Sequence, residues 1–221
     1  MVDYQSFVAN GYYYGHVSEI FSDMSIFYNF AEEAKKLTAT KSHDKCYYIN
    51  DISGQHGSYH REICIDEFDN RQQLIKNNSL VVDQQWWNYS LRGTVDPDTY
   101  ALFRNEISKY MVSIYNHVGL TMDNIAHGDD ITLYEDGDFS KMHTDGQNIG
   151  RHAVILIYFG EDHNDAGGEF VFGTNDKIAP VTGNFVMLDF TKNNPEHGVE
   201  IVKNGFKRIT YIDFVANIDM Q

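Results

Sequence analysis

The stretch Tyr134-Glu-Asp-Gly-Asp-Phe-Ser-Lys-Met-His143-Thr-Asp145 leads from a β-rich run to a histidine and an aspartate two positions apart. On a strand, residues i and i+2 face the same way, so both side chains can reach one ion. His197 offers a second imidazole further along the chain. Two imidazoles and one carboxylate form the facial triad that holds Fe(II) and leaves the opposite positions open. We therefore predict that His143, Asp145 and His197 are metal ligands at a catalytic centre, although a His-x-Asp pair alone is also explained by a structural histidine.

Short β-rich runs surround this stretch from about residue 130 onward, separated by clusters of Gly, Asn and Asp. Val154 to Phe159 is almost wholly apolar and predicts a buried strand. Short strands at close spacing with turn signals between them are typical of a sandwich or barrel. The other predicted strands cover residues 131–134, 169–172, 177–179, 184–188, 198–202 and 208–215.

Residues 1–129 have a different pattern, in which apolar side chains recur at helical spacing. Ser18 to Leu37 and Asp96 to Leu120 are predicted helices, and residues 66–77 predict a further short one. We expect this half to be mainly helical, to pack on the β core of residues 130–221 and to shape the substrate entrance. The predicted fold class is α+β, mainly β with a helical N-terminal half, in a single compact domain.

The segment Gln84-Gln-Trp-Trp-Asn-Tyr89 is a dense cluster of aromatic and amide side chains. Such a cluster can be a platform for a peptide or a small ligand. It can equally be a buried segment that packs against the barrel, and this second interpretation is the simpler one.

Composition and charge restrict the partners of this chain. Its 221 residues are 42% hydrophobic, which is enough for one full core. A net charge of −15 argues against binding to nucleic acid or to an anionic membrane, and the sequence contains no apolar run of about 18 residues that could span one. The two cysteines, Cys46 and Cys64, could pair, but with no leader-like apolar segment at the start we expect a reduced, cytoplasmic protein.

An ordered series of motifs between residues 130 and 216 resembles the prolyl 4-hydroxylase-like branch of the Fe(II)/2-oxoglutarate dioxygenases. The series consists of Tyr134-x2-Gly-x-Phe-x3-His143-x-Asp145, the apolar strand that ends in Tyr158-Phe159, Gly167-Gly-Glu-Phe170 with Phe172, Pro180-Val-Thr-Gly-Asn184, His197-Gly-Val199 and Gly205-Phe-Lys-Arg208. The resemblance implies a double-stranded β-helix, related to the jelly roll and the cupins and flanked by helices. The spacing of the predicted strands agrees with that fold.

The resemblance also implies how a metal and a cosubstrate would be held. His143, Asp145 and His197 would bind Fe(II), and 2-oxoglutarate would chelate the metal through its 2-oxo group and one carboxylate. Tyr134 and Tyr158 match positions at which the family often uses a phenol to hydrogen-bond the cosubstrate. The structural alternative for each tyrosine is a core aromatic whose hydroxyl is satisfied elsewhere.

The far carboxylate of 2-oxoglutarate needs a buried cation, because a lone buried anion is costly. The family's spacing from the distal histidine points to Lys207, whereas strand alternation favours Arg208. Arg208 and Thr210 share one face of the final strand, and Thr210 would add a hydroxyl to the same carboxylate. The opposite face carries Lys207 and Asp213, and Asp213 is a poor residue for the barrel interior.

The implied reaction is hydroxylation of a C–H bond by O2, with decarboxylation of 2-oxoglutarate to succinate. A carboxylate at Asp145 favours hydroxylation, because related halogenases replace it with a small residue. Ascorbate would be an additional cofactor of such an enzyme. The substrate is a peptidyl residue, with proline as one candidate, or a free amino acid or other small molecule. The competing class is a non-catalytic β-helix module that binds a metal or an acidic metabolite.

Overall fold

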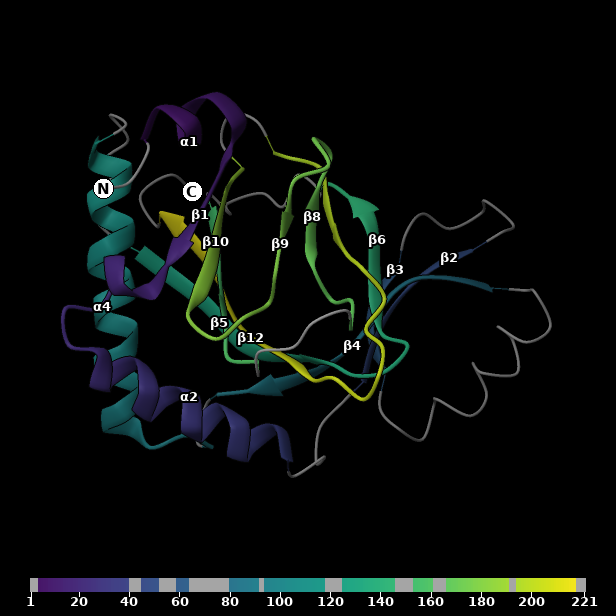
Figure 1. Cartoon of the computed structure of the whole chain (residues 1–221), viewed down its shortest axis with the longest axis horizontal. Coiled ribbons are helices and arrows are strands. Elements are labelled where there is room, and N and C mark those ends of the chain that lie inside the picture. Colours follow the sequence, from purple (N-terminus) through teal and green to yellow (C-terminus); the bar gives the residue numbers. More distant parts are fainter. Residues whose placement is uncertain are drawn as a thin grey trace.

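The computed structural model places helices beside a large antiparallel sheet (Figure 1). It describes residues 4–39, 45–51, 59–63, 80–91, 94–117, 125–145, 153–160, 166–190 and 194–217. The helices in these ranges are α1 (Tyr4–Asn10), the short 3-10 helix η1 (Val17–Glu19), α2 (Met24–Ala39) and α4 (Pro97–His117). The strands are β1 (Tyr12–His16), β2 (Lys45–Asp51), β3 (Tyr59–Ile63), β4 (Leu80–Ser90), β5 (Ile125–Tyr134), β6 (Phe139–His143), β7 (Ala153–Tyr158), β8 (Phe170–Phe172), β9 (Lys177–Ile178), β10 (Asn184–Asp189), β11 (His197–Val199) and β12 (Arg208–Asn217).

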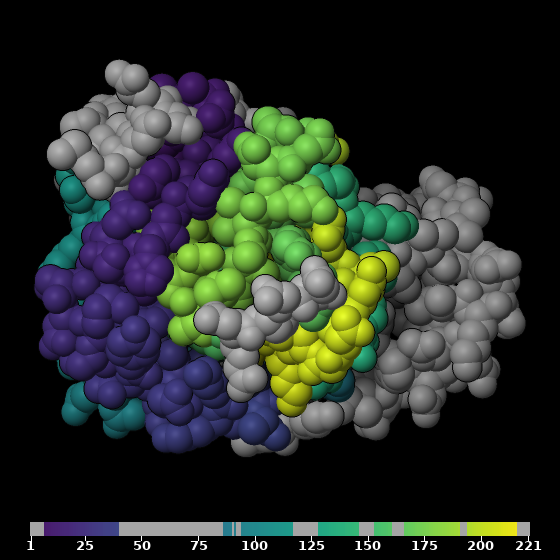
Figure 2. All heavy atoms as spheres, viewed as in Figure 1, coloured from purple at the N-terminus to yellow at the C-terminus, as the bar shows by residue number. Residues whose placement is uncertain are grey.

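Strands from both halves of the sequence build this sheet. Its order is β1-β10-β7-β12-β5-β4-β6-β11-β8-β9, with β2 paired to β4 and β3 paired to β2. β1 therefore adds to β10, and β4 lies between β5 and β6. Figure 2 shows the same mixing at the surface, where the purple N-terminal part lies directly against the green part of the chain.

Strand β7 lies between two hydrophobic cores, one on each face of the sheet. All six residues of β7 are buried. Ile155 and Ile157 belong to the cluster on the helix side, whereas Val154, Leu156 and Tyr158 belong to the cluster inside the barrel. Because successive side chains of a strand point to opposite faces, a strand covered on both faces must be apolar throughout.

The helices close the outer core. Asp96 caps the first turn of α4 by accepting a hydrogen bond from the main-chain N–H of Thr99 at 2.8 Å, and Pro97 starts that turn. Phe30 of α2 and Phe103 of α4 stack with ring centroids 3.8 Å apart, and Phe103 meets Tyr211 of β12 edge-on. These contacts fix the helix pair against the strand that begins with Arg208. No helix in the described part of the chain combines the length and apolar content that crossing a bilayer requires.

The mainly β architecture with flanking helices agrees with the sequence prediction, but the first half of the chain is more varied than predicted. Helices are present over 24–39 and 97–117, close to the predicted ranges. However, β1 to β4 also come from the first half, so residue 130 does not separate a helical part from a β part. The helix predicted over residues 66–77 lies outside the described residues.

Candidate metal centre and buried cation

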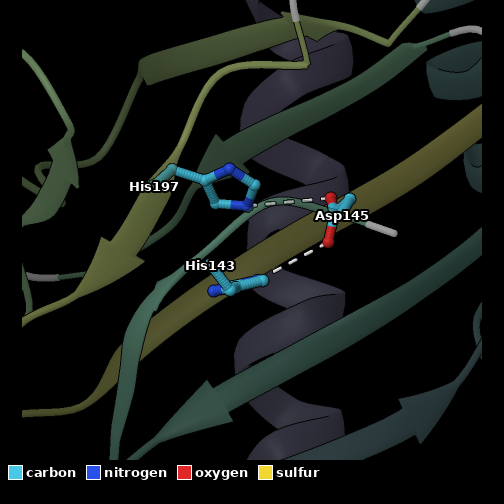
Figure 3. Close-up of side chains that lie close together, drawn as sticks. All are labelled: His143, Asp145 and His197. Atoms are coloured by element: carbon cyan, nitrogen blue, oxygen red, sulfur yellow. Dashed lines mark ion pairs between the residues drawn. The ribbon is translucent and has the colours of Figure 1, made fainter. Parts of the chain in front are cut away.

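Two neighbouring strands bring the predicted metal ligands together. His143 is the last residue of β6 and His197 is the first of β11, and the two residues are directly paired across the ladder. Their rings lie 4.5 Å apart between centroids. Asp145 follows two residues after His143 and turns its carboxylate toward both rings (Figure 3). The sequence separates His143 from His197 widely, and the antiparallel pairing removes that separation.

The donor atoms of these side chains fit a single metal ion. Nε2 of His143 lies 3.5 Å from Oδ1 of Asp145, and Nε2 of His197 lies 3.7 Å from Oδ2. One ligand atom from each residue lies within 4.8 Å of the others. Bonds of about 2.0–2.2 Å from nitrogen and oxygen to a metal put adjacent donors about 3 Å apart, so a small inward shift completes the coordination. Two imidazole nitrogens and one carboxylate oxygen are a donor set suited to Fe(II).

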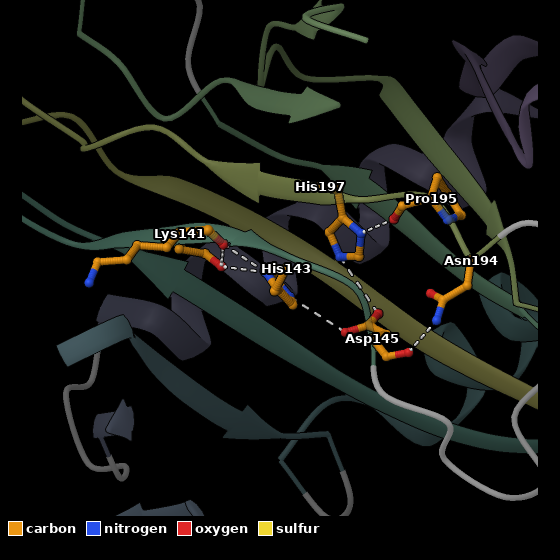
Figure 4. Close-up of polar contacts among 7 residues, drawn as sticks. Lys141, His143, Asp145, Asn194, Pro195 and His197 are labelled. Atoms are coloured by element: carbon orange, nitrogen blue, oxygen red, sulfur yellow. Dashed lines mark hydrogen bonds and ion pairs between the residues drawn. The ribbon is translucent and has the colours of Figure 1, made fainter. Parts of the chain in front are cut away.

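Main-chain carbonyl groups fix the orientation of both rings. Nδ1 of His143 lies 2.8 Å from the carbonyl oxygen of Lys141, and Nδ1 of His197 lies 2.9 Å from that of Pro195 (Figure 4). A carbonyl can only accept, so each Nδ1 carries the proton and each Nε2 is left with a lone pair for the metal.

The electrostatic surroundings of the two rings differ. Burial lowers the pKa of His197, which is 5% exposed, and favours the neutral ring that a metal requires. Burial also acts to lower the pKa of His143, but hydrogen bonds to Asp145 and to the Lys141 carbonyl outweigh it and the net shift is upward. Of the two rings, that of His143 therefore interacts more strongly with the Asp145 carboxylate.

The structure separates the two basic residues that the sequence left as alternatives. Arg208 is 1% exposed, with its guanidinium 4.7 Å from the ring centroid of Tyr134 and 5.0 Å from that of Tyr158. Lys207 points outward, with a side chain 52% exposed and its Nζ 3.8 Å from a carboxylate oxygen of Glu135. Of these two residues, Arg208 is therefore the buried one, and Lys207 lies at the surface.

The charge of Arg208 is not neutralised within the described residues. Its Nη2 donates to the hydroxyl of Tyr158 at 3.5 Å, but its Nε has no hydrogen-bond partner and no described carboxylate forms an ion pair with it. Thr210, on the same face of β12, is fully buried, and its Oγ1 also has no partner. A buried cation without a counter-charge is costly, and a nearby unpaired hydroxyl adds to the cost. The guanidinium of Arg208 and the hydroxyl of Thr210 therefore fit an anionic ligand that accepts a hydrogen bond from each of them.

The Gly167-Gly168 turn connects the cation to the metal ligands. Both glycines have positive φ, at 70° and 77°. A Cβ on Gly167 would overlap the main-chain oxygen of Ile201, and one on Gly168 would lie 3.5 Å from Cδ of Arg208. Two residues later, the ring of Phe170 stacks on that of His197 at 5.2 Å. The main chain of this turn lies against Ile201 and has a positive φ at both positions, which explains why both residues are glycine. Through this turn, the segment that carries Phe170 is held beside Arg208 and His197.

The aromatic segment of β4 also borders this site. Trp86 is half-buried and stacks on Tyr134 at 6.1 Å, so Trp86, Tyr134 and Arg208 form a continuous column. Trp87 faces the other way and packs with the helix-side core. Both tryptophans therefore pack against a core, as the simpler interpretation of this segment expects, and its role as a ligand platform stays a prediction.

Sequence reasoning missed one residue next to the metal ligands. Asn194 donates from Nδ2 to the main-chain oxygen of Asp145 at 2.9 Å. The Asn194-Pro195 pair before His197 is a turn signal, but nothing in its spacing indicates a contact with Asp145.

Comparisons with known proteins agree with this geometry. The sequence profile described as the 2OG-Fe(II) oxygenase superfamily matches residues 130–215. No curated protein matches the sequence of the chain. Among solved structures, a prolyl-4-hydroxylase from Pseudomonas putida is similar with a TM-score of 0.62 and 13% identity, over 97% of this chain and 96% of that one.

Two further hydroxylases share the fold. A prolyl hydroxylase from Trichoplax adhaerens, in complex with a peptide fragment of the hypoxia inducible factor oxygen degradation domain, has a TM-score of 0.64 and 13% identity over 98% of this chain and 88% of that one. The viral collagen prolyl hydroxylase of Paramecium Bursaria Chlorella virus-1, in complex with 2OG, has a TM-score of 0.51 and 17% identity over 78% and 96%. Residues 130–215 therefore match the model of the 2OG-Fe(II) oxygenase superfamily, and the chain shares its fold with solved prolyl hydroxylases.

Proposed function

We propose that this chain is an Fe(II)- and 2-oxoglutarate-dependent hydroxylase, with His143, Asp145 and His197 as its metal ligands. The observation that carries the proposal is the presence, in the same structure as this triad, of a buried guanidinium, that of Arg208, for which no described carboxylate forms an ion pair. A metal triad alone would suit many reactions. A triad with a separate cation in the same barrel suits a dicarboxylate that is held at both ends.

The far carboxylate of 2-oxoglutarate is the anion that best fits Arg208. A guanidinium presents parallel N–H donors that match the two oxygens of a carboxylate. Thr210 offers a hydroxyl from the same face of the strand, and the phenol of Tyr158 already contacts Arg208. Burial raises the pKa of Tyr158, so this phenol stays protonated and can donate to the same anion. Tyr134 covers the other side of the guanidinium with its ring.

The protein's part in the reaction is to hold, orient and exclude water. Fe(II), once bound, supplies the redox chemistry that couples loss of CO2 from 2-oxoglutarate to insertion of oxygen from O2 into a C–H bond. The main-chain carbonyls of Lys141 and Pro195 keep Nε2 of each histidine directed at the metal. The aromatic residues around Arg208 exclude water from the cosubstrate carboxylate, which strengthens its pairing with the guanidinium.

The substrate is a peptidyl residue, such as proline, or a free amino acid or other small molecule. Structural similarity to a prolyl hydroxylase that holds a peptide supports the first class. The half-buried indole of Trp86 beside the cosubstrate column supplies an apolar surface that suits either. Ascorbate would serve as an accessory reductant.

Succinate formation tests the proposal. Purified protein with Fe(II), O2, 2-oxoglutarate and a pool of peptides and amino acids should yield succinate and a product heavier by one oxygen atom. His143→Ala should abolish both. His16→Ala is the matched control, because the His16 ring contacts Ser18 instead of the triad and its loss should leave turnover unchanged. Metal binding by wild type without any succinate would instead identify a non-catalytic binding module.

A further inference from the structure

The turn before β11 contains a device that restrains two metal ligands at once. We propose that Asn194 and Pro195 are positioning residues for the metal centre, Asn194 acting on Asp145 through its side chain and Pro195 acting on His197 through its main-chain oxygen. This inference rests on the proposed function, because it takes the triad to be a metal site.

Asp145 needs a restraint of this kind. His143 and His197 lie within paired strands, whereas Asp145 lies beyond the end of β6, where the hydrogen bonds of the ladder no longer hold the main chain. Nδ2 of Asn194 donates to the main-chain oxygen of Asp145 at 2.9 Å (Figure 4). This bond ties the carboxylate-bearing segment to the turn that leads into the second histidine.

The turn itself is held firmly enough to act as an anchor. The main-chain N–H of Asn194 donates to the carbonyl oxygen of Asp189 at the end of β10, at 3.2 Å. The carbonyl oxygen of Glu196 accepts from the N–H of Gly173 at 2.8 Å. Between these contacts, Pro195 has a fixed φ and its carbonyl oxygen lies 2.9 Å from Nδ1 of His197. The anchor is therefore attached to β10 and to the segment after β8.

The chemistry of Asn194 fits this role better than a purely structural one. Its backbone has φ of 34°, in the left-handed region that asparagine and glycine tolerate best. Glycine would satisfy the backbone equally well, but it has no amide to donate. The Oδ1 atom of Asn194 is buried and has no hydrogen-bond partner among the described residues, a cost that a glycine would avoid. The amide is therefore explained by the bond that it makes to Asp145.

Metal affinity of the apo protein tests the inference without relying on catalysis. Mn2+, which is stable in air, is titrated calorimetrically into wild type, Asn194→Gly and Asn194→Asp. Asn194→Gly keeps the backbone conformation and removes the donor, whereas Asn194→Asp keeps the size and replaces the donor with an acceptor. Loss of a residue that orients a metal ligand typically weakens metal binding by about 10- to 100-fold. We expect at least about a tenfold rise in Kd for Asn194→Gly and a similar or larger rise for Asn194→Asp.

Asn175→Gly is the matched control. Asn175 also has a positive φ, of 69°, in an exposed turn after β8, so the same substitution there changes the backbone in the same way. Its Kd for Mn2+ should equal that of wild type, and all three variants should keep the circular dichroism spectrum and the apo melting temperature of wild type.

Each result has one meaning. An unchanged Kd in both Asn194 variants, beside a wild type that binds Mn2+, would overturn the inference and leave the proposed function intact. A wild type that binds no metal would overturn the proposed function instead. Failure of both Asn194 variants to fold would assign Asn194 to the fold and equally overturn the positioning role.

Discussion

Arg208→Met should separate cosubstrate binding from metal binding. In the Mn2+ form, wild type is expected to bind 2-oxoglutarate through the metal and through the guanidinium of Arg208. Removing one partner of a buried, hydrogen-bonded charge pair costs about 2–5 kcal/mol, because the other charge is left buried and unpaired. The lower figure corresponds to roughly a 30-fold rise in Kd. Calorimetric titration of 2-oxoglutarate measures this, and the Kd for Mn2+ should stay unchanged.

Lys207→Met is the control for this experiment. Lys207 has a side chain that is 52% exposed and forms a surface pair with Glu135, which contributes about 1 kcal/mol or less. Its removal should leave the Kd for 2-oxoglutarate nearly unchanged. If Lys207→Met weakened cosubstrate binding and Arg208→Met did not, the assignment of the buried guanidinium would be wrong.

The stability of the apo protein provides a second test of the same substitution. In wild type without cosubstrate, the Arg208 guanidinium is buried without an ion-pair partner among the described residues. Arg208→Met removes that cost but also loses the contacts with Tyr134 and Tyr158, which contribute about 0.5–2 kcal/mol. We expect a free energy of unfolding, measured with urea, within about 1 kcal/mol of wild type. A loss of about 3 kcal/mol or more would show that Arg208 is paired inside the protein, and would refute its role as a ligand for an external anion.

Two further predictions concern the surroundings of this cation. Trp86 and Trp87 are the only tryptophans of the chain, and only Trp86 stacks in the column over the guanidinium, so 2-oxoglutarate should change the fluorescence of wild type and of Trp87→Phe but not of Trp86→Phe. An equal response in Trp86→Phe would contradict the column. Gly167→Ala should destabilise the fold by about 3 kcal/mol or more, because its Cβ would overlap the oxygen of Ile201. Gly137→Ala, at φ of 86° with open space around it, should cost only the backbone strain of about 1–2 kcal/mol, and equal melting temperatures for the two variants would rule out the steric argument.

The elements that could be predicted from the sequence are those with a local signal. The two-residue spacing of His143 and Asp145 indicates that their side chains lie close together, although Asp145 follows the end of β6 and does not share a strand face with His143. The apolar run of β7 indicates burial on both faces. The helices over 24–39 and 97–117 follow from the period of their apolar residues. The strands of the first half lack such a signal, because β4 becomes a strand through pairing with β5 and β6, which lie far away in the sequence.

The contact between Asn194 and Asp145 is a second feature that the sequence does not predict. The side chain of Asn194 bonds a main-chain carbonyl, and every residue of a protein offers such a carbonyl, so Asp145 carries no mark of its partner in the sequence. Such a partner is found only when the turn and the end of β6 are placed in space.

The choice between Lys207 and Arg208 shows how strand alternation can give the right placement for an incomplete reason. The alternation predicted that Arg208 and Thr210 face inward, and both are buried there. From the sequence alone, Asp213 indicates that the opposite face of this strand lies away from the interior, but Asp213 is fully buried and accepts a hydrogen bond from Tyr211 at 3.2 Å. Both faces of β12 are therefore covered, and a charged residue on such a strand indicates a buried polar partner more than it indicates solvent. What distinguishes Arg208 is that its described partners are aromatic rings and a phenol, which leave its charge for a ligand to neutralise.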